Sequence, residues 1–351
     1  MNKNLNGGVP RSNRGRGHGG VPRPKSVSPF LARACPEPCR REGGKGDGRT
    51  MQQNTMSLYQ AAREAGLSFP KEVEPQDRFV SVGPLRLHYL DWGTEGKPFM
   101  LLLHSNFQTC HTWDFFALTM CQEYHVLSLD LRGHGDSDWS PKSEYNHAAY
   151  LSDLEGLADT LKLPRFLLIG NAMGGMIFMA YAANHPEKAR GLVMVDSAIE
   201  GQSEGGQEIR RFVTAPDELD SFEDFVERTY TFNPRRSKEQ FRGSLRHSLK
   251  QLPNGKWTWK YDKIFRDPTI RRTPSHTSQQ LWEFAARVQC PTLVFRGALS
   301  RVMSQETAAK LRDTLPHSRL IVQEGAGHMV MGDKPVEFER AVRAFIKDFS
   351  L

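Results

Sequence analysis

Residues 166–184 constrain the fold of this chain more than any other segment. Four apolar residues, Phe166–Ile169, precede the turn Gly170-Asn171-Ala172-Met173-Gly174, and a helical pattern runs on to Asn184. A short run that is apolar on every side indicates a parallel strand buried on both faces. The two glycines directly after it favour a turn too sharp for side chains on either side of its tip. The pattern therefore predicts a strand–turn–helix unit with Ala172 at the tip of the turn.

Strand and helix patterns alternate through most of the chain. Strands are predicted near residues 78–82, 86–91, 99–104, 124–129, 165–170, 191–196, 291–296 and 319–323, and helices near 147–162, 173–184, 304–314 and 335–348. Such alternation predicts an α/β fold with a mostly parallel central sheet flanked by helices. Residues 198 to about 285 break the alternation, because they carry amphipathic helical patterns and many aromatic residues.

Six segments carry a resemblance to a known family. They are Phe99–Asn106 with Trp113 after it, Leu127–Ser137 with the pattern D-x-R-G-H-G-x-S, Phe166–Gly175, Val193–Asp196, Pro291–Gly297 and Glu324–His328. In this order and at this spacing they resemble the α/β-hydrolase fold superfamily, from about Arg78 to Leu351. The resemblance implies that the segment of about 198–285 is a helical cap inserted over a small-molecule pocket. Its aromatics (Phe212, Tyr230, Phe232, Trp257, Trp259 and Tyr261) would then line that pocket or form the core of the cap.

The family pattern at the turn is G-x-S-x-G, in which the serine attacks a carbonyl carbon. Here that position is Ala172, whose methyl group cannot form an acyl-enzyme. The resemblance places the two oxyanion donors at the backbone N–H groups of Asn106 and Met173, which a change of side chain does not remove. Ser105 replaces the glycine of the family's H-G pair, and it is expected to shift the loop or to place a hydroxyl in the site.

By the same resemblance, His328 is the base of the site. The family's usual acid position is Arg301, and a cation there is expected to lower the pKa of the histidine and to lie at the mouth of the pocket. Asp196, at the end of a predicted strand, offers a second place for the acid, as in haloalkane dehalogenases and cofactor-free dioxygenases of this fold. Two roles stay open for Asp196: it orients His328, or it caps the connection into the inserted segment.

Three functions are compatible with this degenerate set of Ala172, Arg301 and His328. The first, which the three altered positions favour, is a catalytically impaired homologue that binds a small, partly apolar ligand. The second is an enzyme without a nucleophile, in which His328 and Asp196 act by general-base chemistry, either like a cofactor-free dioxygenase or by activating water. The third is a weak ester or C–C bond hydrolase. No cofactor is implied in any of them.

Charge separates the chain into two parts. Residues 1–55 hold eleven Lys/Arg and three Asp/Glu in a Gly/Pro/Arg-rich context, whereas the remainder holds 36 and 37. The first part is predicted to be a disordered extension, residues 56–77 a linker or N-terminal helix, and residues 78–351 the folded domain. The near-neutral domain predicts no nucleic-acid or membrane partner. The five scattered cysteines fit neither a disulfide framework nor a metal site, so a reduced, cytoplasmic setting is expected; a homodimer stays open.

Overall fold

The structure is a computed structural model that describes residues 56–200, 203–267 and 276–351. The predicted extension of residues 1–55 therefore lies outside the described residues. The first described element is the short helix α1 (Leu58–Glu64), which falls within the segment predicted as a linker or N-terminal helix. None of the described helices is long and apolar enough to cross a membrane.

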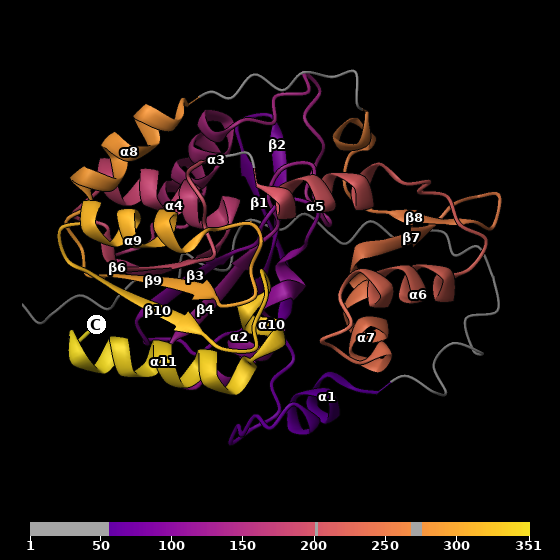
Figure 1. The fold of residues 1–351 in the computed structure, drawn as a ribbon, viewed down its shortest axis with the longest axis horizontal. Helices are drawn as coiled ribbons and strands as arrows, with labels where there is room; N and C mark the ends of the chain where they lie inside the picture. Colours follow the sequence, from indigo (N-terminus) through magenta and orange to yellow (C-terminus); the bar gives the residue numbers. More distant parts are fainter. Residues whose placement is uncertain (1–55, 201–202, 268–275) are drawn as a thin grey trace, which may run out of the picture. The chain divides into compact units, whose positions relative to one another are not determined.

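An eight-stranded sheet forms the centre of the domain (Figure 1). Its spatial order is β1-β2-β4-β3-β5-β6-β9-β10, in which β1 and β2 are antiparallel to their neighbours and the other strands run parallel. The strands are β1 (Gln76–Val82), β2 (Leu85–Asp91), β3 (Phe99–Leu103), β4 (His125–Leu129), β5 (Phe166–Asn171), β6 (Ala189–Val195), β9 (Thr292–Gly297) and β10 (Ser318–Gln323). All eight strands predicted from the sequence are present, with ends shifted by two residues at most.

Helices cover both faces of the sheet and divide the core into two clusters. One cluster involves α3 (His147–Thr160), α4 (Met173–Asn184), α8 (Ser278–Arg287) and α9 (Gln305–Thr314). The other involves α1, the 3-10 helix η2 (Cys110–Trp113), α2 (Asp114–Met120), α10 (Val330–Asp333) and α11 (Pro335–Asp348). Because β5 and β9 lie between these two layers, every one of their residues is buried. The fold is the α/β-hydrolase fold.

The chain between β6 and β9 forms a separate group of elements beside the sheet (Figure 1). It contains α5 (Glu204–Thr214), α6 (Phe222–Phe232), α7 (Lys238–Ser248), the two-stranded sheet of β7 (Leu249–Gln251) and β8 (Trp257–Trp259), and the 3-10 helix η3 (Lys263–Arg266). We call residues 203–267 the insert. Helix α8 follows it but packs on α4 and α9, so the predicted boundary near residue 285 falls inside a helix of the sheet layer.

The helices of the insert begin at residues suited to cap them. Ser203 caps α5, and Ser221 and Ser237 form capping boxes at the starts of α6 and α7. In each case the serine hydroxyl accepts a hydrogen bond from a backbone N–H of the first turn that would otherwise lack a partner. The antiparallel pair β7–β8 was not predicted, because strands of three residues are too short to show an alternating pattern.

Two glycines allow the backbone segments around the turn between β5 and α4 to pack in close contact. A Cβ on Gly170 would lie 2.5 Å from the carbonyl carbon of Gly174, and a Cβ on Gly174 would lie 2.4 Å from the carbonyl oxygen of Leu103. Both obstacles are backbone atoms, which cannot move aside as a flexible side chain can. The two glycines are therefore required for helix α4 to start this close to strands β3 and β5.

We expect Gly174→Ala to lower the free energy of unfolding by at least about 2 kcal/mol, because the new methyl group overlaps the backbone of β3. The measurement is urea denaturation at equilibrium. Gly243→Ala on helix α7 is the matched control, since no atom lies within 4 Å of a Cβ added there. Alanine favours the helix by about 0.5–1 kcal/mol over glycine, so the control should be neutral or stabilising. Equal effects of the two changes would contradict the steric account.

Candidate functional site

Ala172 occupies the strained tip of the turn between β5 and α4. Its backbone has φ 47° and ψ −111°, a region that costs a non-glycine residue about 1–3 kcal/mol. The N–H of Ala172 donates to the carbonyl of Val195 on the adjacent strand β6 at 2.8 Å, which helps to hold this conformation. Its side chain faces the main cavity of the domain. The turn therefore has the shape that would present a serine hydroxyl, but it presents a methyl group.

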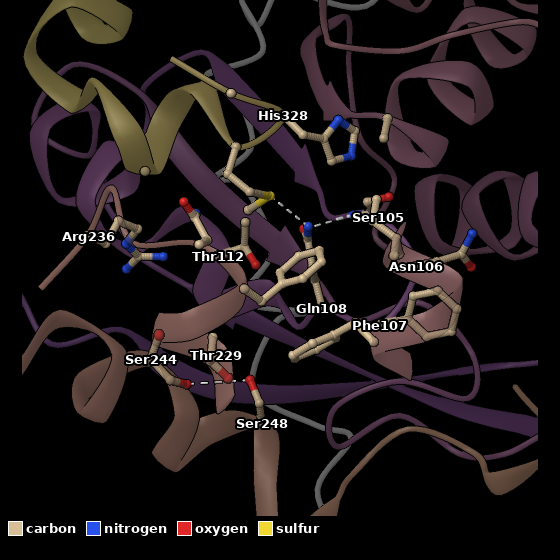
Figure 2. Close-up of a pocket in the computed structure, with 18 of the residues that line it drawn as sticks. Ser105, Asn106, Phe107, Gln108, Thr112, Thr229, Arg236, Ser244, Ser248 and His328 are labelled. Carbon is tan, nitrogen blue, oxygen red and sulfur yellow. Dashed lines mark hydrogen bonds between the residues drawn. The ribbon is translucent and has the colours of Figure 1, made fainter. Parts of the chain in front are cut away.

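His328 and Asp196 form a hydrogen bond. The Nδ1 of His328 lies 2.6 Å from Oδ2 of Asp196, which is the bond expected if the acid follows β6. Because a carboxylate only accepts, Nδ1 carries the proton, and the lone pair of a neutral ring is then on Nε2. His328 lines the cavity, as Ala172 does, and Figure 2 shows its ring there next to Ser105. The imidazole is thus held in the tautomer that can take a proton from a group in the cavity.

Asp196 is fully buried, and several donors surround its carboxylate. Besides His328, the hydroxyl of Ser300 donates to Oδ2 at 2.5 Å and the N–H of Gly297 donates to Oδ1 at 3.3 Å. The residue itself has a positive φ of 49°. A buried charge is tolerated when hydrogen bonds replace its water shell, so the loop after β9 is fitted to an anion at this position.

Arg301 pairs with two acids of the insert. Its guanidinium turns outward and donates to Glu208 at 2.5 Å and to Glu204 at 2.8 Å, both on helix α5 of the insert. Its side chain is 56 % exposed, and Asp196 instead holds the ring of His328. Arg301 lines the rim of the cavity, and two carboxylates of α5 bind it there. The sequence did not show where α5 would lie.

Met173 and Asn106, the residues predicted to supply the oxyanion donors, both line the cavity. Met173 is the first residue of α4, a position where the N–H has no partner within its own helix. In the described part of the chain neither of these N–H groups donates to a backbone or side-chain acceptor. Both residues line the cavity, so the donors are available to a bound ligand.

A network of side chains fixes the loop that carries Asn106. The Nε2 of His104 accepts from the N–H of Leu131 at 3.0 Å, so its Nδ1 carries the proton and donates to the carbonyl of Ser105 at 2.7 Å. Gln108 accepts from the N–H of Ser105 at 3.2 Å and donates to Asn171 at 3.4 Å. Ser105 is therefore built into the loop by its backbone.

A cavity of about 1740 Å³ joins these groups to the insert. One part of its wall is polar and includes Thr112, Thr229, Arg236, Ser244 and Ser248, which Figure 2 labels. Aromatic side chains from the loop after β3 and from the insert form an apolar part of the cavity wall. Of the six aromatics singled out in the sequence, Phe212, Phe232 and Trp259 line the cavity, whereas Tyr230, Trp257 and Tyr261 do not. Trp257 packs instead against Phe222, with ring centroids 5.4 Å apart.

Two side-chain clusters have the residue types of a metal site, although none was predicted. His88, Cys110 and Asp130 are buried together, and Asp130 accepts from Nδ1 of His88 at 2.7 Å. Cys110 is one of three buried free thiols in the described residues. His111, Asp114 and His247 form the second cluster at the cavity wall, where the two imidazoles stack with centroids 3.5 Å apart. In each cluster the candidate ligand atoms lie within 4.8 Å of one another.

The fold and the site together define an α/β-hydrolase type of protein with Ala172 at the tip of the turn between β5 and α4. Residues 98–335 match the family described as alpha/beta hydrolase fold, and the chain belongs to that family.

The curated relatives include the esterase Rv0045c of Mycobacterium tuberculosis, 28% identical over 82% of this chain and 94% of the relative. They also include the 3-hydroxybutyrate-oligomer hydrolase of Cupriavidus necator, 26% identical over 77% of this chain and 98% of the relative. The crystal structure of esterase Rv0045c superposes with a TM-score of 0.67 at 26% identity, covering 83% of this chain and 96% of that chain.

The stacked pair of His111 and His247 predicts a loss of stability in acid. Burial, then the nearby charges of His111, Arg246 and Lys260, lower the pKa of His247 to about 3. Burial would also lower the pKa of His111, but the carboxylate of Asp114 raises it overall. Since the unfolded chain protonates His247 near pH 6.5, its contribution to stability is present above that pH and is lost as the pH falls toward 3.

Replacing His247 by glutamine should therefore reduce the fall in melting temperature between pH 7 and pH 4.5. Differential scanning fluorimetry across this range measures it. His317→Gln is the control, because His317 is exposed on the loop before β10. A His247→Gln curve parallel to that of the unmodified protein would contradict the assignment.

Proposed function

We propose that this protein is a hydrolytic enzyme that uses His328, oriented by Asp196, as a general base on water. The hydrogen bond of 2.6 Å between Nδ1 of His328 and Oδ2 of Asp196 carries the proposal. It leaves the basic Nε2 of the ring for a group in the cavity above Ala172. Relatives named as esterases and hydrolases support an ester or a related acyl compound as the substrate. From the sequence alone, the alanine at position 172 favoured a binding protein. The hydrogen-bonded pair of His328 and Asp196 favours catalysis instead.

The reaction proceeds without a covalent enzyme intermediate. The substrate carbonyl oxygen accepts hydrogen bonds from the N–H groups of Met173 and Asn106. His328 removes a proton from a water molecule through Nε2, and the oxygen of that water attacks the carbonyl carbon. The tetrahedral oxyanion is stabilised by the two N–H groups. As it collapses, the bond to the leaving group breaks and the leaving oxygen takes the proton from His328, which regenerates the neutral base.

A second function is favoured by Ala172 itself. Without a hydroxyl at the tip of the turn, the cavity is suited to bind an acyl compound without cleaving it. In that case the pair of His328 and Asp196 contributes hydrogen bonds to the ligand and no proton transfer. This alternative differs from the first in one measurable respect, namely whether any turnover depends on His328.

We expect His328→Ala to lower the rate of hydrolysis of short-chain p-nitrophenyl esters by about 10²–10⁴-fold, because it removes the base. The unmodified protein should show no burst phase, and incubation with a fluorophosphonate should add no mass to it. Equal rates for the unmodified protein and the variant would exclude the proposed catalysis and leave the binding protein. A stoichiometric adduct within the cavity would exclude the mechanism without a nucleophile.

Replacing Ala172 by serine should give the protein a conventional nucleophile in one step. Because Asp196 already orients His328, we expect Ala172→Ser alone to raise the ester hydrolysis rate by at least about 10²-fold and to permit fluorophosphonate labelling. Arg301→Asp should add nothing to this gain, since it would break the ion pairs with Glu204 and Glu208 and place a third acid beside them.

Rates and labelling are measured for Ala172→Ser, Arg301→Asp, the pair together, and Ala172→Ser with His328→Ala. The last variant is the control, and it should lose the gain. If only the combination with Arg301→Asp were active, Asp196 would be structural and the acid would belong at position 301.

A further inference from the structure

Arg236 reaches the cavity from the insert, just before helix α7. Figure 2 labels it together with His328 among the side chains around one pocket. Its guanidinium carbon lies 5.0 Å from the ring centroid of Phe241. The guanidinium also lies close to Gly332 of α10, since a Cβ added to this glycine would lie 3.4 Å from Nη1 of Arg236. The ring of Phe241 and the backbone of Gly332 thus lie close to the guanidinium, which binds hydrogen-bond acceptors through its edge.

The guanidinium of Arg236 has no acceptor within residues 56–200, 203–267 and 276–351. Its Nε is buried without a hydrogen-bond partner, and no carboxylate lies within ion-pair distance. The acid whose charge reaches it is Asp333, and both oxygens of that residue are engaged. They accept from the N–H of Gly327 at 2.8 Å and from Nδ2 of Asn233 at 3.4 Å. Burial accordingly lowers the pKa of Arg236, and the charge of Asp333 only partly opposes it.

A second donor on the same wall is also unsatisfied. The hydroxyl of Thr229 on α6 is buried without a hydrogen-bond partner in the described residues and lines the cavity with Arg236. The Nε of Arg236 and the hydroxyl of Thr229 are buried without a partner among the described residues, and each destabilises the protein by an amount that a ligand acceptor would recover. Their presence on the wall of one cavity indicates that the acceptor comes from the ligand.

We propose that Arg236 binds a carboxylate of the ligand, so that the substrate class is an acyl ester or amide that carries a free carboxylate away from the scissile carbonyl. The second part of the proposal rests on the proposed function; the binding of the carboxylate does not. One guanidinium neutralises one negative charge and matches the two oxygens of a carboxylate. A phosphate dianion would need a further cation, whereas the carboxylate of Asp333 adds negative charge beside Arg236.

The two ends of such a substrate fit one cavity. Gly332, which backs the guanidinium, follows His328 by four residues, so their Cα atoms are at most about 14 Å apart even for extended chain. Part of this segment is the helix α10, which shortens the separation. A carboxylate on Arg236 therefore leaves the other end of a short acid within reach of His328.

Binding tests the anchor without any need for turnover. The probes are glutarate, adipate and suberate, their neutral dimethyl esters, and inorganic phosphate, measured by calorimetric titration of the full chain. At least one dicarboxylate should bind, and more tightly than its dimethyl ester. Arg236→Gln should weaken that binding about tenfold to a hundredfold, and Arg236→Lys should weaken it less because the charge remains. Arg211→Gln, which removes an exposed charge from the rim of the same cavity, should change it less than threefold.

Stability separates an anchor from a structural arginine. If Arg236 awaits a ligand, Arg236→Met should keep or raise the melting temperature of the ligand-free protein, because it replaces an unpaired buried cation by an apolar chain. It should also abolish the rise in melting temperature that a bound dicarboxylate gives to the unmodified protein. A large loss of stability in the ligand-free variant would show that Arg236 supports the fold, and it would overturn the proposal.

Three other results would overturn it: no probe acid binds, phosphate binds more tightly than every dicarboxylate, or Arg236→Gln binds as the unmodified protein does. Hydrolysis of the monomethyl esters is measured in parallel for the unmodified protein and for His328→Ala. Binding that depends on Arg236 without turnover would leave the anchor in place and exclude the proposed function. Turnover that depends on His328 but not on Arg236 would support the proposed function and exclude the anchor.

Discussion

The buried carboxylate of Asp196 is the constraint on which the site depends. It follows β6 at the carboxyl edge of the sheet and accepts hydrogen bonds from His328, Ser300 and Gly297. These donors come from the loop after β10, the loop after β9 and the end of β9 itself. Since a buried anion must be surrounded by donors, the three segments are drawn to one point. The position of the histidine above the turn between β5 and α4 is a consequence of this arrangement.

The turn at Ala172 shows that its geometry does not depend on the serine that the family carries there. The close approach of α4 to β3 and β5 is set by Gly170 and Gly174, which face backbone atoms, and by the hydrogen bond from Ala172 to Val195. An alanine in this backbone region bears the same steric strain as a serine, because the strain arises at Cβ. The turn therefore keeps its shape without a hydroxyl at its tip.

The sheet and its flanking helices could be predicted because their signals are local. Strands such as Phe166–Asn171 are apolar throughout, and helices such as Pro335–Asp348 have a strong amphipathic period. The ends of β6 and β10 could also be assigned, so Asp196 and His328 were found. The direction of Arg301 could not, because it depends on Glu204 and Glu208 of an insert whose position no local pattern encodes.

The same reason explains why the sequence left the roles of the aromatic residues in the insert open. Trp257 and Trp259 look equivalent in the sequence, and residues two apart on a strand face the same side. However, Trp257 begins β8 and packs on Phe222, whereas Trp259 at its end reaches the cavity. Arg236 gave no signal, since an arginine before a helix usually points into solvent. Its environment exists only once α7 meets α10, through the contact with Gly332.

The retention of His328 is harder to explain by folding than that of Asp196. Without the histidine, Asp196 would still accept from Ser300 and Gly297, so its burial does not require an imidazole. The side chain of His328 is 17 % exposed and lines the cavity, so part of its ring is accessible to a bound molecule. An imidazole held in one tautomer at the wall of a cavity is placed to interact with such a molecule. This asymmetry between the two partners of one hydrogen bond is the physical reason to regard the site as functional despite Ala172.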